Sequence, residues 1–185
     1  MTPLCPTAAA TSWCIPLDKA RIPIAQITLF GILGALTFGL KVAMSWLPNI
    51  EPVSLLVMLY AVIFGRKAVY PIYLYVILEI LVYGLGTWNF MYLYIWAVLA
   101  IAAWLLRKME SPLGWALLSG VYGLAFGFLC APVDIFIGGI GYAMSKWASG
   151  ILFDIWHCAG NFVMALLLFV PMRRLLGKLY GKLRV

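Results

Sequence analysis

Six runs of apolar residues limit what this chain can fold into more than any other feature. They cover Ile22–Trp46, Val53–Gly65, Ala68–Gly86, Phe90–Leu106, Leu113–Ala131 and Gly150–Pro171. A helix needs about 20 apolar residues to cross a bilayer, and most of these runs approach that length. The chain is 65% hydrophobic and 10% charged, whereas a soluble domain is about half apolar and a quarter charged. The runs lack the alternation of a membrane β-barrel, so we expect an all-α integral membrane protein.

The positions of the basic residues predict that both termini are cytoplasmic. Of 13 Lys and Arg residues, 11 fall at the two ends or in alternate loops: Lys19, Arg21, Arg66, Lys67, Arg107, Lys108, Arg173, Arg174, Lys178, Lys182 and Arg184. Lys and Arg concentrate in cytoplasmic segments. We therefore expect a six-transmembrane-helix bundle over residues 22–172, between a flexible cytoplasmic extension (1–21) and a basic cytoplasmic tail (173–185). The short second run counts as a span, strongly tilted or of half depth.

Two uncharged stretches are expected as connections on the outside. Pro132–Ser149 contains Gly138, Gly139 and Gly141 and is expected as a long loop. The stretch from Gly84 to Phe90 is expected as an aromatic-rich loop. Within these stretches Trp88, Asn89 and Trp147 are candidates to stack on or hydrogen-bond a flat ligand. The alternative is that the Trp residues only anchor the protein at the membrane interface, where Trp is common.

Glu79 is the clearest ionisable residue inside an apolar run. It lies about 11 residues into the third run, or roughly 16 Å at 1.5 Å per residue, near the middle of a span. Ionisable groups inside a bilayer are costly and usually functional. Glu79 is interpreted either as a carboxylate that binds ligand or carries a proton, or as a structural group between helices. Lys41 and Glu51, near the outer surface, form either a surface ion pair or the mouth of an outward cavity.

The sixth run places three polar side chains on one helical face. Asp154, His157 and Asn161 have spacings of i, i+3 and i+7, which a helix brings to one side. They form either a polar wall that receives a ligand from outside or a hydrogen-bond network between helices. Catalysis is the weakest alternative, because Asp154 and His157 would be its only acid–base pair.

Small residues recur at helical spacing on two runs. Gly31, Ala35 and Gly39 form a ridge on the first run, and Ser119, Gly123, Gly127 and Ala131 form another on the fifth. Such ridges let helices approach closely. Each ridge either packs within the chain or docks on another membrane protein.

Several classes of function are not indicated. The four cysteines lack metal-site spacing and there is one histidine, so we expect no metal and no cofactor. The chain has no nucleotide-binding loop and no basic patch interleaved with aromatics, so neither its own ATP hydrolysis nor nucleic-acid binding is expected. We do not expect an enzyme.

Four local stretches carry a resemblance to a known family. They are Leu47-Pro-Asn-Ile-Glu-Pro-Val53, Phe64-Gly-Arg-Lys-Ala68, Tyr83-Gly-Leu-Gly86 and Phe153-Asp-Ile-Trp-His-Cys-Ala-Gly-Asn161. With the six expected helices, they resemble the substrate-binding S component of energy-coupling factor (ECF) vitamin transporters, over about residues 22–175. The motifs are similar to those of a subgroup of unassigned substrate.

The resemblance implies a function and partners. An S component binds a vitamin or precursor from outside and docks on a transmembrane T component that carries two cytoplasmic ATPases. It topples in the prokaryotic plasma membrane and releases its ligand inside. The family docks through Ala-xxx-Ala on its first helix, to which Gly31, Ala35 and Gly39 correspond without matching the residue types. The pocket position corresponds to Trp88, Asn89, Trp147, Asp154, His157 and Asn161. The alternative function is a self-contained proton-coupled transporter of small solutes that uses Glu79.

Overall fold

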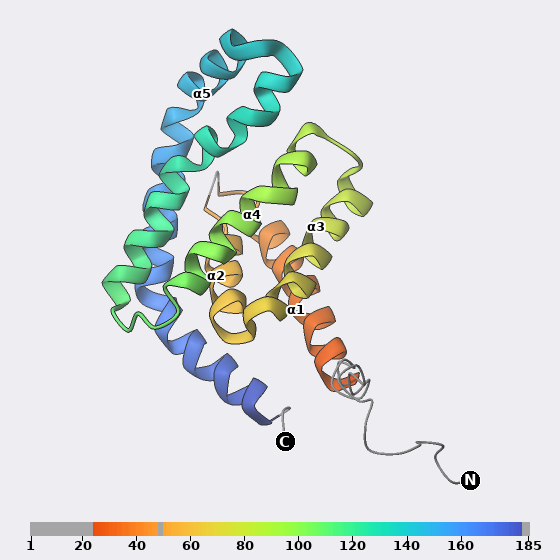
Figure 1. Ribbon diagram of the computed structural model, residues 1–185, viewed down its shortest axis with the longest axis vertical. Coiled ribbons are helices and arrows are strands. Elements are labelled where there is room, and N and C mark those ends of the chain that lie inside the picture. The colour runs from red at the N-terminus through yellow and green to blue at the C-terminus, as the bar shows by residue number, and fades with distance from the viewer. Residues whose placement is uncertain (1–23, 48–49, 183–185) are drawn as a thin grey trace, which may run out of the picture.

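A computed structural model describes residues 24–47 and 50–182, and these residues form helices joined by short connections. The elements are α1 (Ile24–Ala43), α2 (Val53–Phe64), the 3-10 helix η2 (Gly65–Ala68), α3 (Val69–Tyr83), α4 (Thr87–Leu105) and α5 (Pro112–Lys182). α5 consists of two arms, because Gly139 takes a φ of 78° and breaks the helix. The arms run side by side in opposite directions (Figure 1). The expected extension at residues 1–21 lies outside the described residues.

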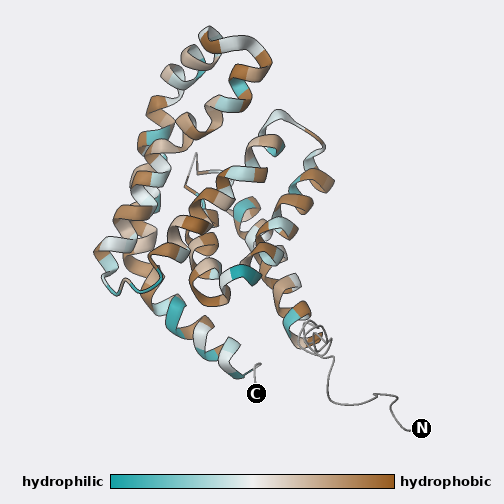
Figure 2. Cartoon of the chain, in the orientation of Figure 1, coloured by the Kyte–Doolittle hydropathy of each residue, from teal (hydrophilic) through white to brown (hydrophobic). Residues whose placement is uncertain are grey.

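The helices are apolar enough for a lipid environment. Four stretches have the length and hydropathy to cross a membrane: Ile24–Ala43, Val53–Tyr83, Thr87–Leu105 and Pro112–Lys182. Apolar residues line most of each helix (Figure 2), and large ones such as Leu81 and Phe136 are 72% and 91% exposed. Exposed apolar surface of this extent is typical of contact with a membrane or a partner. The prediction of an all-α protein with membrane-compatible helices is confirmed.

The short helix α2 lies at the centre of the molecule. Ten of its 12 residues are buried. The Tyr60 hydroxyl lies 2.9 Å from Thr37 Oγ1 of α1 and donates to the Leu33 carbonyl oxygen at 3.1 Å. Phe64 packs edge-on against Tyr180 of α5, with ring centroids 4.7 Å apart. α2 therefore contacts helices from both ends of the chain.

Glycines allow two of the helix pairs to approach closely. A Cβ on Gly34 of α1 would lie 2.8 Å from Leu74 Cδ2 of α3, and a Cβ on Gly123 would lie 2.8 Å from the His157 carbonyl group in the other arm of α5. Gly120 also faces this arm, with more room: a Cβ there would lie 3.3 Å from Phe162 Cβ and 3.5 Å from the Cys158 carbonyl oxygen. The ridge of small residues on the fifth run therefore packs within the chain, which decides between its two interpretations.

The long connection expected over Pro132–Ser149 is wrong. Both arms of α5 remain helical there, and only Gly139 leaves the helical backbone. Glycine costs about 1 kcal/mol inside a helix, but each arm here packs on the other. Asp134 and Lys146 join them through an ion pair of 2.6 Å between Oδ1 and Nζ. Contacts between the arms outweigh the local preference of the glycines for a turn.

Two other boundaries differ from the expectation. α4 begins at Thr87, so Trp88 and Asn89 lie in its first turn and not in a loop. The Asn89 side chain caps this helix, since its Oδ1 accepts a hydrogen bond from the Gly86 N–H at 2.7 Å. The second arm of α5 continues through Pro171 to Lys182, so the described part of the basic tail is helical. Arg173 there donates to the carbonyl oxygens of Met109 and Arg107, each at 3.0 Å.

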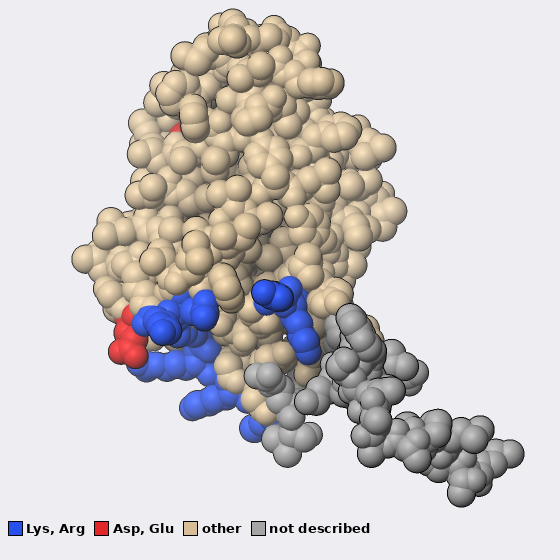
Figure 3. All heavy atoms as spheres, in the orientation of Figure 1, with Lys and Arg blue, Asp and Glu red and all other residues tan. Residues whose placement is uncertain are grey.

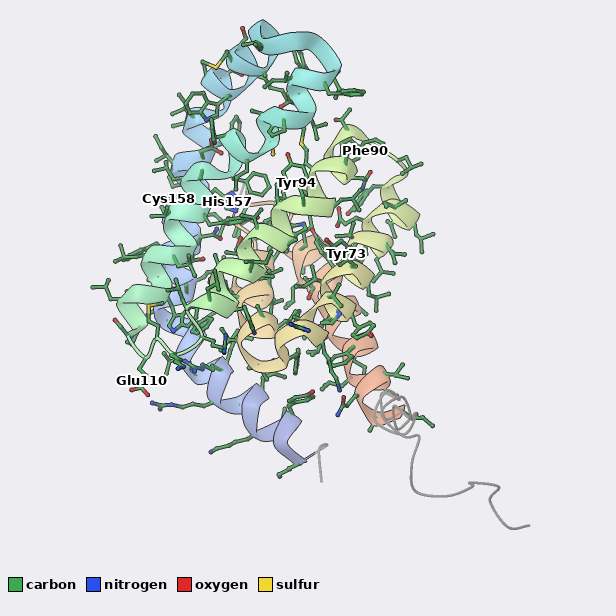
Figure 4. The ribbon with its side chains drawn as sticks, in the orientation of Figure 1. Tyr73, Phe90, Tyr94, Glu110, His157 and Cys158 are labelled. Carbon is green, nitrogen blue, oxygen red and sulfur yellow. The ribbon has the colours of Figure 1, made fainter. Side chains whose placement is uncertain are left out.

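Basic residues gather at one end of the molecule. Figure 3 shows Lys and Arg clustered near the C-terminus, beside acidic atoms, while the rest of this face is almost free of charge. Arg66 and Lys67 belong to η2, Arg107 and Lys108 follow α4, and the others lie near the end of α5. Glu110 lies at the same end, between α4 and α5 (Figure 4). We call this the basic end, and the side of the α5 turn the opposite end.

Candidate functional site

A buried ion pair joins α1 to α3 toward the opposite end. Lys41 Nζ lies 2.6 Å from Glu79 Oε2. The Glu79 side chain is 1% exposed and the Lys41 side chain 20%. Because α3 ends at Tyr83, Glu79 lies about one helical turn from that end of the helix. Lys41 thus pairs with Glu79, whereas the sequence suggested Glu51 as its partner.

Tyrosine rings surround the lysine, and Glu51 lies in the same electrostatic environment. The Lys41 ammonium lies over the Tyr83 and Tyr92 rings, 5.8 and 5.5 Å from their centroids. Glu51 precedes α2, outside the membrane-compatible helices, and burial raises the pKa of its carboxyl group. Lys41 lowers that pKa in part, and the charge of Glu79 raises it. The charges of Lys41 and Glu79 thus both act on the Glu51 carboxyl group, while the ion pair of Lys41 is with Glu79.

A second polar cluster lies on the inner face of α5. Asp154, His157 and Asn161 are all buried, as their helical spacing predicts. Asp154 Oδ1 accepts a hydrogen bond from the Gly127 N–H at 3.1 Å. Asn161 Nδ2 donates to Ser54 Oγ of α2 at 3.1 Å and to the Ser119 carbonyl oxygen at 3.3 Å. Figure 4 shows His157 on the side of α5 that faces the other helices.

A chain of aromatic rings connects the two clusters. The Tyr92 and Trp96 rings of α4 have centroids 5.3 Å apart, and Trp96 lies 6.0 Å from Phe126 of α5. Phe126 packs edge-on against His157 at 4.8 Å. Tyr92, Trp96 and Phe126 are not among the residues predicted from the sequence to form the site. A sequence signal exists for two of them. Asn89, Tyr92 and Trp96 have the spacing i, i+3, i+7, which puts a polar residue and two aromatic residues on one helix face.

The predicted tryptophans differ in their relation to these clusters. Trp147 belongs to the second arm of α5, and its Cδ1 would lie 3.1 Å from a Cβ on Gly127, the residue that binds Asp154. Its ring also packs edge-on against Phe128 at 5.8 Å. Trp88 covers Gly86 and is 43% exposed. The structure thus brings Trp147 near the α5 cluster and leaves Trp88 at the surface.

Unpartnered polar atoms mark the interior of the site. Among the described residues, the buried side-chain atoms without a hydrogen-bond partner include Glu79 Oε1, Asn89 Nδ2, Asp154 Oδ2, His157 Nδ1 and Asn161 Oδ1. All five belong to residues that the sequence predicted as a binding site. Trp96 Nε1 and Ser119 Oγ have the same property. A buried polar group without a partner costs roughly 1–3 kcal/mol, so a polar solute that binds here recovers this free energy.

The ridge on α1 faces outward. Ala35 and Gly39 are exposed and Gly31 is half-buried. A Cβ on Gly31 or Gly39 would meet no atom of the described chain within 4 Å, in contrast to Gly34. An apolar groove between α1 and α3, lined in part by Ile27, Gly31 and Tyr70, continues this face. At Gly31 and Gly39 this surface is therefore open within the described part of the chain.

The described residues contain no group of three or more His, Cys, Asp and Glu side chains that could hold a metal ion. Comparison of the chain with protein-family models, curated proteins and solved structures gives no match.

Proposed function

We propose that this protein is the high-affinity substrate-binding S component of an ECF-type transporter that imports a vitamin or related micronutrient. One observation carries the proposal: five predicted site residues each bury a polar atom that has no partner in the described chain. Polar groups inside a membrane protein usually mark a solute or ion pathway. Aromatic rings between the two clusters add flat apolar surface, which a ring-shaped solute also needs.

The distribution of charge supports six spans with both termini in the cytoplasm of a prokaryote. The spans are α1, α2, α3, α4 and the two arms of α5, and the basic end faces the cytoplasm under the positive-inside rule. The polar clusters then lie toward the outside, where the solute enters. ATP hydrolysis is assigned to two cytoplasmic subunits bound to a T component, since the chain has no nucleotide-binding loop.

The proposed topology predicts opposite accessibility at two exposed positions. In a variant with all four native cysteines replaced, Leu85→Cys, at a site 78% exposed, should react with an impermeant maleimide in intact cells. Lys182→Cys should react only after permeabilisation, because it belongs to the basic end. Labelling of residue 182 but not residue 85 in intact cells would reverse the proposed orientation.

The outward ridge on α1 is the proposed docking face for the T component. Small residues allow two membrane helices to approach closely, and among the described residues nothing lies within 4 Å of a Cβ placed on Gly31 or Gly39 of this ridge. Ala35 is exposed at its centre. Of the polar clusters, only Lys41 lies on α1. It is six residues beyond Ala35 and about 120° away around the helix, so a change at Ala35 alters docking without reaching the clusters.

We expect Ala35→Trp to abolish co-purification with the T component and ATP-dependent uptake. The affinity for ligand should stay within about threefold of the parent, or about 0.65 kcal/mol. Val121→Trp is the matched control, because residue 121 is 64% exposed on α5 and lies away from the ridge. Co-expression with the partner subunits and affinity purification measures the effect. Unchanged co-purification of Ala35→Trp would refute the docking face.

A proton-coupled transporter is the second candidate, and one observation favours it. Burial raises the pKa of the Glu51 carboxyl group, on which the charge of Glu79 also acts, so Glu51 is suited to carry a proton. Liposomes that contain this chain alone separate the candidates. Solute uptake driven by a pH gradient supports this second function, whereas uptake only with partner subunits and ATP supports the first.

A further inference from the structure

We propose that the cluster of Lys41, Glu79, Glu51, Tyr83 and Tyr92 binds a small organic cation. The Lys41 ammonium group occupies the position of the ligand's cation until the ligand displaces it. The inference rests on the proposed function, because it names the chemical class of the solute that the chain binds. We call this set of five residues the cation cluster.

Two tyrosine rings of the cation cluster face the Lys41 ammonium group. Tyr83 of α3 and Tyr92 of α4 present their rings to the same ammonium group, at 5.8 and 5.5 Å from the centroids. A cation within about 6 Å of an aromatic centroid is attracted by the ring, and more strongly where water is excluded. Aromatic groups arranged around a cation also recognise substituted ammonium ligands. The rings are therefore already placed for a ligand cation.

The carboxyl groups of the cation cluster have an oxygen that Lys41 does not use. Lys41 uses only Oε2 of Glu79, while Oε1 is buried and has no partner among the described residues. Glu51 adds a second carboxyl group that interacts with both Lys41 and Glu79. Lys41 thus forms its ion pair with Glu79 and acts on Glu51 at longer range. A cation that enters the cluster finds spare acceptor capacity even before Lys41 moves away.

The balance of charged residues outside the basic end also favours a cationic ligand. In the described chain this part holds four carboxylates, Glu51, Glu79, Asp134 and Asp154, but only two lysines, Lys41 and Lys146. Asp134 and Lys146 neutralise each other. The remaining formal charge is negative, and uncompensated charge is costly to bury. A positive solute reduces that cost, whereas an anionic one raises it.

The exposure of the ion pair indicates how a ligand enters. The Lys41 side chain is 20% exposed and that of Glu79 is 1% exposed. The cluster is therefore accessible from the lysine side, and movement of one flexible side chain uncovers the carboxylate. Lysine has a long stem with four rotatable bonds, so it leaves and returns without a change in the helices.

The second ion pair of the chain supplies a matched control. Lys146 and Asp134 are also 2.6 Å apart, and Lys146 lies 5.8 Å from the Tyr142 centroid. This pair differs in that Lys146 is 44% exposed and has one ring in place of two. It joins the arms of α5 away from the cation cluster. Lys146→Met therefore removes a comparable ion pair without changing the proposed site.

The test measures binding of benzyltrimethylammonium and of its neutral isostere neopentylbenzene to the purified full chain in nanodiscs. Tryptophan fluorescence is a suitable signal because Trp96 contacts Tyr92. We expect the cation to bind and the isostere not to bind at the same concentrations. Lys41→Met should lower the Kd for the cation about tenfold. If Lys41 fills the site in about nine-tenths of the molecules, only about one-tenth are free to bind, and the apparent Kd of the parent is about tenfold higher. Lys146→Met should leave the Kd unchanged.

Two further variants keep the inference testable if Lys41→Met does not fold. Tyr92→Leu and Glu51→Gln should each raise the Kd of the cation severalfold, because they remove a ring and a carboxylate. Equal binding of cation and isostere, or no change in these variants, would overturn the inference. If Ala35→Trp no longer co-purifies with the T component but the parent chain does not bind the cation, the proposed function stands and the cation site is refuted. If the parent chain binds the cation but Ala35→Trp still co-purifies with the T component, the cation site stands and the docking role is refuted.

Discussion

Gly123→Leu is expected to destabilise the fold more than any other single change considered for this chain. A Cβ at residue 123 would lie 2.8 Å from the carbonyl carbon and oxygen of His157 and 2.9 Å from the Cys158 nitrogen. These are backbone atoms, so they cannot turn aside as a flexible side chain would. The two arms of α5 must separate. Overpacking of this kind costs about 1–3 kcal/mol and sometimes more, and we expect a value of about 3 kcal/mol or above.

Gly150→Leu in the same helix is the matched control. A Cβ at residue 150 would meet no atom of the described chain within 4 Å, and the helix propensities of the two substitutions are alike. By the scale for chains of this size, about 3 kcal/mol lowers the melting temperature by roughly 6–12 °C. Thermal unfolding followed by size-exclusion chromatography measures both variants. Similar melting temperatures for the two would show that the arms of α5 do not pack at Gly123.

Asn161→Ala is expected to weaken ligand binding by about 5- to 150-fold. Asn161 is 1% exposed, and its Nδ2 is engaged with Ser54 and Ser119. Its Oδ1 has no partner in the described chain and is therefore available to accept a hydrogen bond from the ligand. Loss of that bond leaves a buried donor of the ligand unpaired, at roughly 1–3 kcal/mol. Since 1.4 kcal/mol is a factor of ten, this cost corresponds to the stated range.

Gln26→Ala separates binding from general stability. Gln26 is also a buried amide, 4% exposed, but it accepts a hydrogen bond from Lys67 Nζ at the basic end. Its truncation removes a comparable group far from the site. Native mass spectrometry of gently purified protein measures the fraction of chains that retain a small-molecule adduct. We expect this fraction to fall for Asn161→Ala and not for Gln26→Ala. Equal retention would show that Asn161 serves only in helix packing.

Much of the secondary structure follows from the sequence, because hydropathy is a local property. The apolar runs match α1 to α4 to within a few residues at most ends. The prediction of a long connection over Pro132–Ser149 was wrong, because the local sequence does not show how the two arms of α5 pack together. Gly138, Gly139 and Gly141 resemble one another in sequence, but only Gly139 has a positive φ. The facing arm of α5 decides which glycine turns.

The candidate site was predictable where it lies on one helix. The spacing of Asp154, His157 and Asn161 determines that they share a face, because a helix repeats every 3.6 residues. It does not determine what that face meets. The hydrogen bond from Asn161 to Ser54 joins residues 107 positions apart, and the contact of Phe126 with His157 depends on the pairing of the α5 arms.

The sequence by itself determined which residues form most of the apolar helices and where the basic end lies. It also determined that Glu79, Asp154, His157 and Asn161 lie within those helices. These properties depend on composition and on helical periodicity, which are written along the chain. The tertiary structure alone decided that Lys41 pairs with Glu79, 38 residues away, and that Gly34, not Gly31, is the close contact of α1 with α3. Partner choice depends on how helices rotate and cross. That geometry is set by the packing of all the helices together, so no single segment contains it.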